Sequence, residues 1–293
     1  SLRMGRLGYQ SDAQATLAVS YNGLTGYANS LHEALTKPYP AYEALGIRNP
    51  GGDYNQLGTS LLQIENEFYG TIRPKRTVRT GERPLHALRE RGVEYVEVRL
   101  MDLDPFESVG IAAQTMRFLD VFLLHCLLSD SPPDTPAEIA QIKHNQHLTA
   151  ERGREPGLTL QRQGQPVALA TWGADILAEC APLAAALDAA HATDAYSVAL
   201  QAAQARLAQP ESTPSARVLQ EMAAQGNSFN AFALQQSVRA RDALLQQPWP
   251  AVQQQHFEAL ARESIAAQKA IEAADTLAFE DWRQRYVAVE ELG

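Results

Sequence analysis

Cysteine is scarce in this sequence: its 293 residues include two, Cys126 and Cys180. Two cysteines cannot supply the disulfide framework of a small secreted protein, so we expect no disulfides in the fold. Cys126 lies in the apolar run 122–128, where a buried and unreactive thiol is expected. This cysteine usage favours a reducing compartment, and we predict a cytoplasmic protein.

An excess of positive charge is also lacking. Lysine and arginine number 25 against 34 aspartate and glutamate residues, which gives a formal net charge of −9. Non-specific nucleic-acid binding needs a basic surface, so we expect no nucleic-acid partner. A nucleotide substrate is compatible with this charge, because one local basic pocket is enough to bind it. No apolar run reaches the roughly 20 residues of a membrane-spanning helix, so we expect no membrane partner.

The rest of the composition is ordinary for a globular protein, with 45% hydrophobic and 20% charged residues. The patterns change from mixed to helical near residue 106. Before it lie helical patterns at 23–35 and 84–91 and two strong strand patterns. After it we expect a helix at 109–128, a second helix that starts at Thr135 and Pro136, and a short strand at 158–161. Four or five further helices should follow, with starts at Thr213 and Thr276. We therefore predict an α+β fold with a sheet-containing portion (1–106) and a helical portion (107–293) packed on it.

The two strand patterns, residues 63–76 (QIENEFYGTIRPKR) and 93–106 (VEYVEVRLMDLDPF), carry most of the ionisable groups of interest. In the second, Val96 and Val98 fall on one face at period two, and Glu97 and Arg99 fall on the other. In the first, we expect a face of Glu65, Glu67, Tyr69, Thr71 and Arg73. Such one-sided strands suit an antiparallel sheet. The charged face is either a solvated surface of cross-strand ion pairs or the floor of a site for phosphate, metal and carboxylate.

Basic residues cluster where the first of these strands ends. Lys75 and Arg76 follow Pro74, so both side chains can reach a pocket mouth. The alternative for this RPKR cluster is a solvated basic edge, which also discourages sheet aggregation. For Arg73 and Arg76 the sequence leaves these two interpretations open.

Six segments, in this order, resemble the proteobacterial glutamate–cysteine ligase (γ-glutamylcysteine synthetase) family. They are SLRMGRLGYQ, IENEFYGTIRPKR, GVEYVEVRLMDLDPF, RFLDVFLL, GREPGLTL and EAADTLAFEDW. The resemblance runs nearly end to end and is weaker at about 161–212 and 224–262. No single motif is decisive, but the ordered set favours this family.

The resemblance implies a sheet like that of glutamine synthetase as one wall of the active site, followed by a mostly helical C-terminal half. It implies an ATP-dependent ligase that makes γ-glutamylcysteine from L-glutamate and L-cysteine through γ-glutamyl phosphate. This reaction is the first step of glutathione synthesis. ATP and Mg²⁺ are the implied cofactors.

The resemblance also implies roles for single residues on the charged strand face. Glu97 matches a metal ligand, and Arg99 matches a residue that touches the transferring phosphoryl group. Lys75 matches a phosphate contact, and we place Arg73 with it as a candidate nucleotide-binding residue. A carboxylate for a hard cation and guanidinium or ammonium groups for phosphoryl oxygens suit phosphoryl transfer. From the residues alone, a strand-face ion pair between Glu97 and Arg99 is the competing interpretation.

Three further residues match substrate-binding positions of the family. Tyr9 and Tyr69 match residues that line the cysteine site, although a core tyrosine is the ordinary alternative. Arg3 matches an arginine that grips the substrate carboxylate or the activated phosphate, and we place it with Arg99 among the catalytic candidates. A guanidinium suits this role because it binds a carboxylate through two parallel hydrogen bonds.

The chain begins at Ser1, directly inside a segment that resembles the family. We therefore expect the C-terminal part of a longer ligase, inactive alone, with the family's N-terminal part and most of its metal-binding carboxylates missing. Two other interpretations stay open. One is a related carboxylate–amine ligase with another amine substrate, and the other is a non-enzymatic helical interaction protein.

Overall fold

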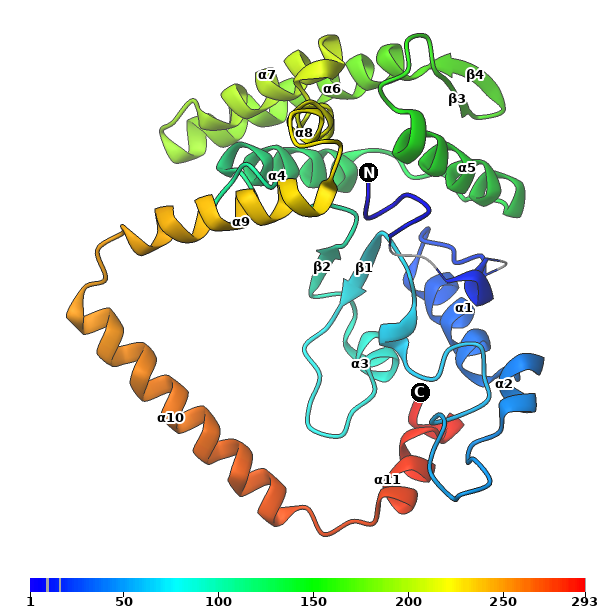
Figure 1. The fold of residues 1–293 in the computed structure, drawn as a ribbon. Coiled ribbons are helices and arrows are strands. Elements are labelled where there is room, and N and C mark those ends of the chain that lie inside the picture. Colours follow the sequence, from blue (N-terminus) through cyan, green and yellow to red (C-terminus); the bar gives the residue numbers. More distant parts are fainter. Residues whose placement is uncertain (9–10, 16, 293) are drawn as a thin grey trace. The chain divides into compact units, whose positions relative to one another are not determined.

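The computed structural model describes residues 1–8, 11–15 and 17–292. These residues form two compact units, each built from two stretches of chain (Figure 1). The first unit comprises Ser1–Asn22 and Val98–Ala243, and the second comprises Gly23–Glu97 and Leu244–Gly293. The predicted portions, 1–106 and 107–293, were defined by strand and helix patterns, whereas these two units are defined by contacts. The predicted portions therefore stay a prediction.

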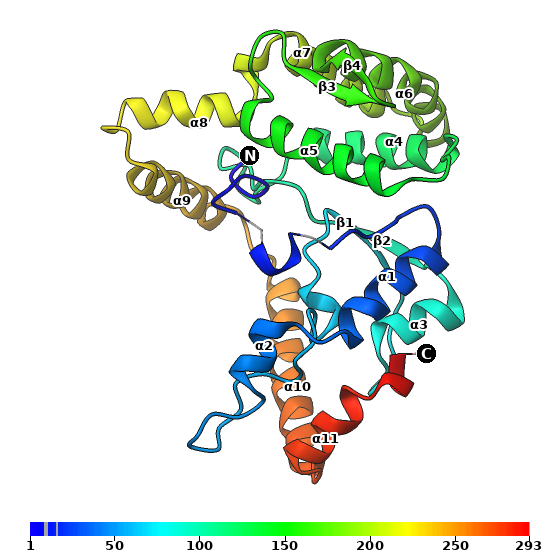
Figure 2. The ribbon, with the colours of Figure 1, turned by 90° about the vertical axis from the view of Figure 1, so that its right-hand side faces the viewer.

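The first unit is mostly helical. Its elements are α4 (Ala113–Leu128), α5 (Pro136–Arg152), β3 (Thr159–Arg162), β4 (Gln165–Ala168), α6 (Leu169–His191), α7 (Ala195–Ala208), α8 (Pro214–Ala223) and most of α9 (Phe229–Leu245). Helices α6 and α7 lie side by side and α4 packs against both (Figures 1 and 2). Their shared core contains Val121, Cys180 and Ala184, all fully buried. Strands β3 and β4 form an antiparallel hairpin, of which only β3 was predicted.

Helix starts in this unit follow the predicted signals. Thr135 accepts a hydrogen bond from the backbone N–H of Glu138 and Thr213 accepts one from Ala216, each with proline at the first helical position. Both predicted starts are confirmed. Cys126, in contrast, is exposed and not buried, because the helical period that turns Val121 inward turns Cys126 outward.

The second unit contains α1 (Leu24–Thr36), α2 (Pro40–Leu45), β1 (Ile72–Lys75), α3 (Pro84–Arg91), β2 (Tyr95–Val98), α10 (Ala251–Ala274) and α11 (Phe279–Tyr286). Helix α1 packs on α3, and their buried faces present Tyr27, Leu31, Leu85 and Leu88. Helix α11 starts at Phe279, three residues after the predicted start at Thr276. Six helices, α6 to α11, follow β4 in the described chain, against the four or five predicted.

The first predicted strand is much shorter than its pattern indicated. Residues 65–67 form a single 3₁₀ turn, and only Ile72–Lys75 is a strand. The expected alternation fails because Glu65 points inward, where it is 7% exposed and pairs with Arg83. The prediction of a strand over 63–76 is therefore wrong for its N-terminal half.

The second predicted strand is confirmed at Tyr95–Val98, and it pairs with β1 in a two-stranded sheet whose strands run in opposite directions (Figure 1). Helix α3 packs against β1, which a two-stranded sheet needs for stability. Val96 in β2 is 45% exposed and Leu100, two residues after the strand, is 43% exposed, so neither side chain is buried among the described residues. The α+β class is confirmed, and the likeness of the sheet to glutamine synthetase stays a prediction.

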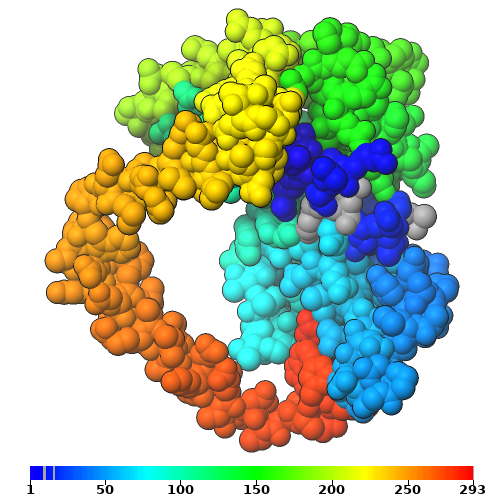
Figure 3. All heavy atoms as spheres, viewed as in Figure 1, coloured from blue at the N-terminus to red at the C-terminus, as the bar shows by residue number. Residues whose placement is uncertain are grey.

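Helix α10 has no buried residue along its 24 positions (Figure 3). Its exposed side chains include Val252, Phe257, Leu260, Ile265 and Ile271. An apolar surface of this kind on a helix is unusual for an isolated soluble protein. None of the helices in the described ranges is both long and apolar enough to cross a membrane.

Candidate functional site

Two ion pairs connect the strands of the β1–β2 sheet. Lys75 Nζ lies 3.5 Å from a carboxylate oxygen of Glu97, and Arg76 lies 3.7 Å from Glu94. The Glu94 backbone N–H donates to the carbonyl of Lys75 at 2.8 Å. The side chains of Lys75 and Glu97 remain 25% and 34% exposed, although the Glu97 oxygen that faces Lys75 is itself buried. The structure thus brings together two of the predicted site residues on one sheet.

Glu94 is held in its ionised form beside this pair. The pKa of its carboxyl group lies below the ordinary value because the Thr77 backbone N–H donates to it, with a smaller contribution from Arg76. Glu94 is therefore a fixed negative charge that neutralises Arg76.

Arg73 lies below this surface rather than on it. It is 4% exposed, and its guanidinium donates to the carbonyl oxygens of Asn66, at 2.8 Å, and Phe68. These bonds fix the turn that leads into β1 and hold the backbone next to Tyr69, which is 40% exposed. The predicted contact of Arg73 with a nucleotide stays a prediction.

The residue behind this turn is a buried tyrosine. The ring of Tyr27 meets Phe68 edge-on, with centroids 6.5 Å apart. Burial raises the pKa of Tyr27 to about 12, against the lowering effect of Arg73. Tyr27 therefore stays protonated and uncharged at neutral pH and packs behind the turn.

The sequence patterns missed a buried ion pair that supports α3. Arg83 precedes α3, and its guanidinium lies 2.8 Å from Glu65, with both side chains almost fully buried. Glu65 also accepts a hydrogen bond from the backbone N–H of Leu85, in the first turn of α3. Arg83 stacks on the ring of Tyr286 at 4.3 Å and donates to its carbonyl, which ties α11 to the same cluster. Nothing local in the sequence joins residues 65, 83 and 286, so no periodicity could have found this cluster.

In the first unit, the structure brings together the two arginines predicted to be catalytic. The Arg3 backbone N–H donates to Asp102 at 2.7 Å, and the Arg3 side chain donates to the carbonyl of Arg99. Arg99 directly follows β2 in the sequence and is half-buried. The N-terminal segment is therefore anchored to residues 99–102. Tyr9, the other substrate-binding candidate near the N-terminus, lies outside the described residues.

Within the described ranges, one group of three side chains has metal-ligand spacing: Glu82, His86 and Glu90. Glu82 lies two residues before α3, and His86 and Glu90 lie on α3. The sequence patterns missed this spacing of four residues. Arg91 already binds the Glu82 carboxylate through bonds of 2.6 and 2.7 Å, and this lowers the pKa of Glu82 to about 2. In this ion-pair cluster Arg91 pairs with Glu82 and lies 3.7 Å from Glu90, and His86 lies 3.3 Å from Glu90. The cluster does not include Glu97.

Comparison with known proteins gives a consistent family. Residues 1–149 match the family model described as glutamate–cysteine ligase. The glutamate–cysteine ligase of Azotobacter vinelandii is 48% identical over 288 residues, which cover 98% of this chain and 54% of that protein. The one of Bordetella parapertussis is 47% identical over 290 residues, covering 98% of this chain and 55% of the relative. The chain thus spans about half the length of the curated relatives it matches.

Solved structures agree with this family. A crystal structure of the Francisella tularensis glutamate–cysteine ligase in complex with AMP matches with a TM-score of 0.89 and 34% identity. The match covers 98% of this chain and 56% of that one. A bifunctional glutathione synthetase from Pasteurella multocida matches with a TM-score of 0.55 and 22% identity, a likeness of fold alone.

Proposed function

Because the chain belongs to the glutamate–cysteine ligase family, we propose that it carries part of an ATP-dependent ligase that joins the γ-carboxylate of L-glutamate to L-cysteine. The observation that carries this proposal is the 48% identity to a named ligase over 98% of the chain. In the reaction, the γ-carboxylate attacks the γ-phosphate of ATP and γ-glutamyl phosphate forms. The cysteine amine then displaces phosphate, giving γ-glutamylcysteine for glutathione synthesis.

Lys75 and Arg99 are the proposed cationic contacts of the phosphates. Lys75 is exposed enough to leave Glu97 and bind a nucleotide phosphate oxygen. Arg99 would stabilise the charge that spreads over the transferring phosphoryl group, where a planar guanidinium is better suited than an ammonium. Arg3 contacts the backbone of Arg99, which supports its role at the substrate carboxylate or the activated phosphate. Arg73 stays in the proposal on the sequence resemblance alone.

Tyr69 is the proposed wall of the cysteine pocket, together with Tyr9. The exposed ring of Tyr69 offers a flat apolar surface and a hydroxyl, which suit a small amino acid. The buried Arg73 fixes the carbonyl of the preceding Phe68, so the backbone at Tyr69 is held in place before substrate binds. A rigid pocket wall reduces the ordering cost of binding.

The residues of this chain can be compared with what a Mg²⁺ site requires. Mg²⁺ demands six oxygen ligands in near-octahedral geometry. Glu97 is a single carboxylate, and among the described residues it belongs to no group of three or more potential metal-ligating side chains. The described residues do not by themselves fit a complete Mg²⁺ site, and Glu97 is proposed as one ligand only.

The proposal also covers which part of the family protein this chain corresponds to, and its cellular location. We propose that the chain corresponds to the C-terminal part of the family protein, and that alone it binds ATP weakly and shows no ligase turnover. The single carboxylate at Glu97 supports this expectation. A cytoplasmic location is also proposed, on the cysteine usage of the sequence.

A chimera tests this function. This chain would replace the matching 54% of the Azotobacter vinelandii ligase, and γ-glutamylcysteine and ADP would be measured with glutamate, ATP and a panel of amines. We expect ATP-dependent product with cysteine as the preferred amine. Preference for another amine would indicate a related carboxylate–amine ligase. A chimera that is folded and binds ATP but makes no product with any amine would contradict the proposal.

A further inference from the structure

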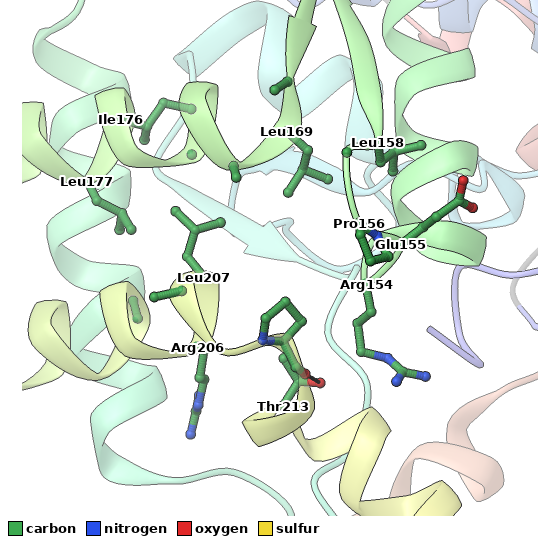
Figure 4. Close-up of a pocket in the computed structure, with 18 of the residues that line it drawn as sticks. Arg154, Glu155, Pro156, Leu158, Leu169, Ile176, Leu177, Arg206, Leu207 and Thr213 are labelled. Carbon is green, nitrogen blue, oxygen red and sulfur yellow. Dashed lines mark hydrogen bonds between the residues drawn. The ribbon is translucent and has the colours of Figure 1, made fainter.

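The first unit contains a cavity that the proposed ligase chemistry does not use. It has a volume of about 640 Å³ and lies between α6, the end of α7 and the loop of residues 153–158 (Figure 4). None of the candidate site residues described above lines it. Its volume falls in the range of small-molecule sites in proteins, roughly 300–1,000 Å³.

Apolar side chains form the walls of the cavity. Figure 4 shows Leu158, Leu169, Ile176, Leu177 and Leu207 around the hollow. Leu158 and Leu169 are held opposite each other, because the backbone N–H of Leu169 donates to the carbonyl of Leu158 at 2.9 Å. The walls are therefore set by regular structure and do not depend on a ligand.

A glycine keeps part of the wall open. A Cβ atom added at Gly173 would lie 3.0 Å from both terminal methyl groups of Leu207. The absence of a side chain at this position of α6 lets Leu207 turn toward the helix and leaves space beside it. Any larger residue would push Leu207 into the hollow.

Two guanidinium groups lie at the rim. Arg154 and Arg206 extend to the same side of the apolar walls, with Thr213 between them (Figure 4). Among the described residues, Arg206 has no hydrogen-bond or ion-pair partner. Arg154 has one long ion pair, 3.7 Å, to Glu211, whose side chain is 74% exposed.

The one carboxylate among the described residues of the lining is already neutralised. Glu155 is bound by Arg152 through two bonds of 2.6 Å, and its pKa is lowered by them. The rim therefore presents net positive charge next to an apolar hollow. We propose that this cavity binds a small amphipathic carboxylate, with its apolar body among the leucines and its carboxylate at the rim that Arg154 and Arg206 form.

The two halves of the cavity select this class of ligand. A neutral apolar molecule would form no charge-assisted bond with either guanidinium group, and a small inorganic anion would leave the apolar walls exposed to water. A carboxylate on an acyl chain satisfies both, because guanidinium groups bind carboxylates through charge-assisted hydrogen bonds. Burial of the acyl chain among the leucines adds a favourable contribution that grows with its length.

Decanoate is the probe, and 1-decanol is its matched neutral control. Isothermal titration of the chain at pH 7 should show saturable binding of decanoate with one site. Binding of 1-decanol should be at least about tenfold weaker, the loss expected when a charge-assisted bond is not made. Equal binding of the two compounds would show a merely apolar surface and would overturn the proposal.

Two pairs of variants locate the site. Ala170 and Ala174 are both exposed alanines on α6, and only Ala170 lines the cavity. Ala170→Trp should fill the mouth and weaken decanoate binding by more than about tenfold, and Ala174→Trp should leave it unchanged. Arg206→Gln should weaken decanoate binding by about tenfold without affecting 1-decanol, and Arg239→Gln, an exposed arginine outside the cavity, should have no effect.

Thermal melts would confirm that all four variants fold. Decanoate binding that is undetectable at millimolar concentration, or that is equally strong in folded Ala170→Trp, would overturn the proposal. The second result would place binding on another surface, such as the exposed apolar side chains of α10. Either result leaves the ligase proposal untouched, because no residue of this cavity takes part in it.

Discussion

The buried pair of Glu65 and Arg83 predicts a strong and non-additive effect on stability. Three nitrogen–oxygen contacts of 2.8 to 3.2 Å join the two side chains, and both are less than 8% exposed. Removing one partner of such a pair leaves an uncompensated buried charge, which typically costs about 3–5 kcal/mol. We expect Glu65→Leu and Arg83→Met each to lower the free energy of unfolding of the second unit by that amount.

The double variant should lose much less than the sum of the two. With both charges replaced by apolar side chains, no buried charge is left unpaired. The remaining losses are the bond from Leu85 to Glu65 and the contacts of Arg83 with Tyr286. We therefore expect the double variant to be more stable than additivity predicts by at least about 2 kcal/mol.

Urea unfolding at pH 7 measures these free energies. The rings of Trp282 and Tyr286 stack with centroids 4.8 Å apart, so the fluorescence of Trp282 reports on α11. Circular dichroism reports on the helices of the whole chain. If Arg83→Met costs less than about 1 kcal/mol, or if the two effects add, the pair is not the buried support that the structure indicates.

Three other predictions concern separate features. Thr135→Ala should lower the free energy of unfolding by about 1 kcal/mol in urea titrations, because the N–H of Glu138 loses its cap; no loss would contradict the capping role. Hydrogen bonds from Arg91 lower the pKa of Glu82 from 4.5 to about 2, so the unfolded state binds more protons between these values and stability should fall as pH falls through that window. Glu82→Gln should flatten this acid limb in melts between pH 2 and 6, and an unchanged limb would refute it. The exposed apolar side chains of α10 predict self-association of the chain, and Leu260→Gln should reduce it in analytical ultracentrifugation while changing stability by less than about 0.5 kcal/mol; absent or unchanged association would contradict this prediction.

Local signals predicted much of the fold. The helix over 84–91 has its predicted bounds, since proline marks its first turn and glycine follows its end. The caps at Thr135 and Thr213 are also local features, readable from a hydroxyl residue before proline. The period-two pattern of β2 correctly placed Glu97 on a face shared with a neighbouring strand, where Lys75 meets it.

Contacts between distant residues could not be predicted in this way. Glu65 has the spacing of an exposed strand residue, and only Arg83, 18 residues later, makes its burial favourable. Arg73 was expected on the open face for the same reason, and its bonds to two carbonyl oxygens are invisible in the pattern. The bond between Arg3 and the backbone of Arg99 spans 96 residues. The family resemblance named both arginines, but composition and periodicity gave no sign that they meet.

The kinetics of Arg99→Ala in the ligase chimera test the central claim most directly. A donor aimed at developing phosphoryl charge acts in the transition state, so we expect kcat to fall about 10²–10³-fold while KM for glutamate and cysteine changes little. Arg99→Lys should recover little of this loss, because an ammonium cannot reproduce the planar fork. Arg239→Gln, with the same thermal stability, is the control and should keep normal turnover. Near-normal kcat in a folded Arg99→Ala chimera would remove Arg99 from the chemistry and leave the bond between its carbonyl and Arg3 as its structural role.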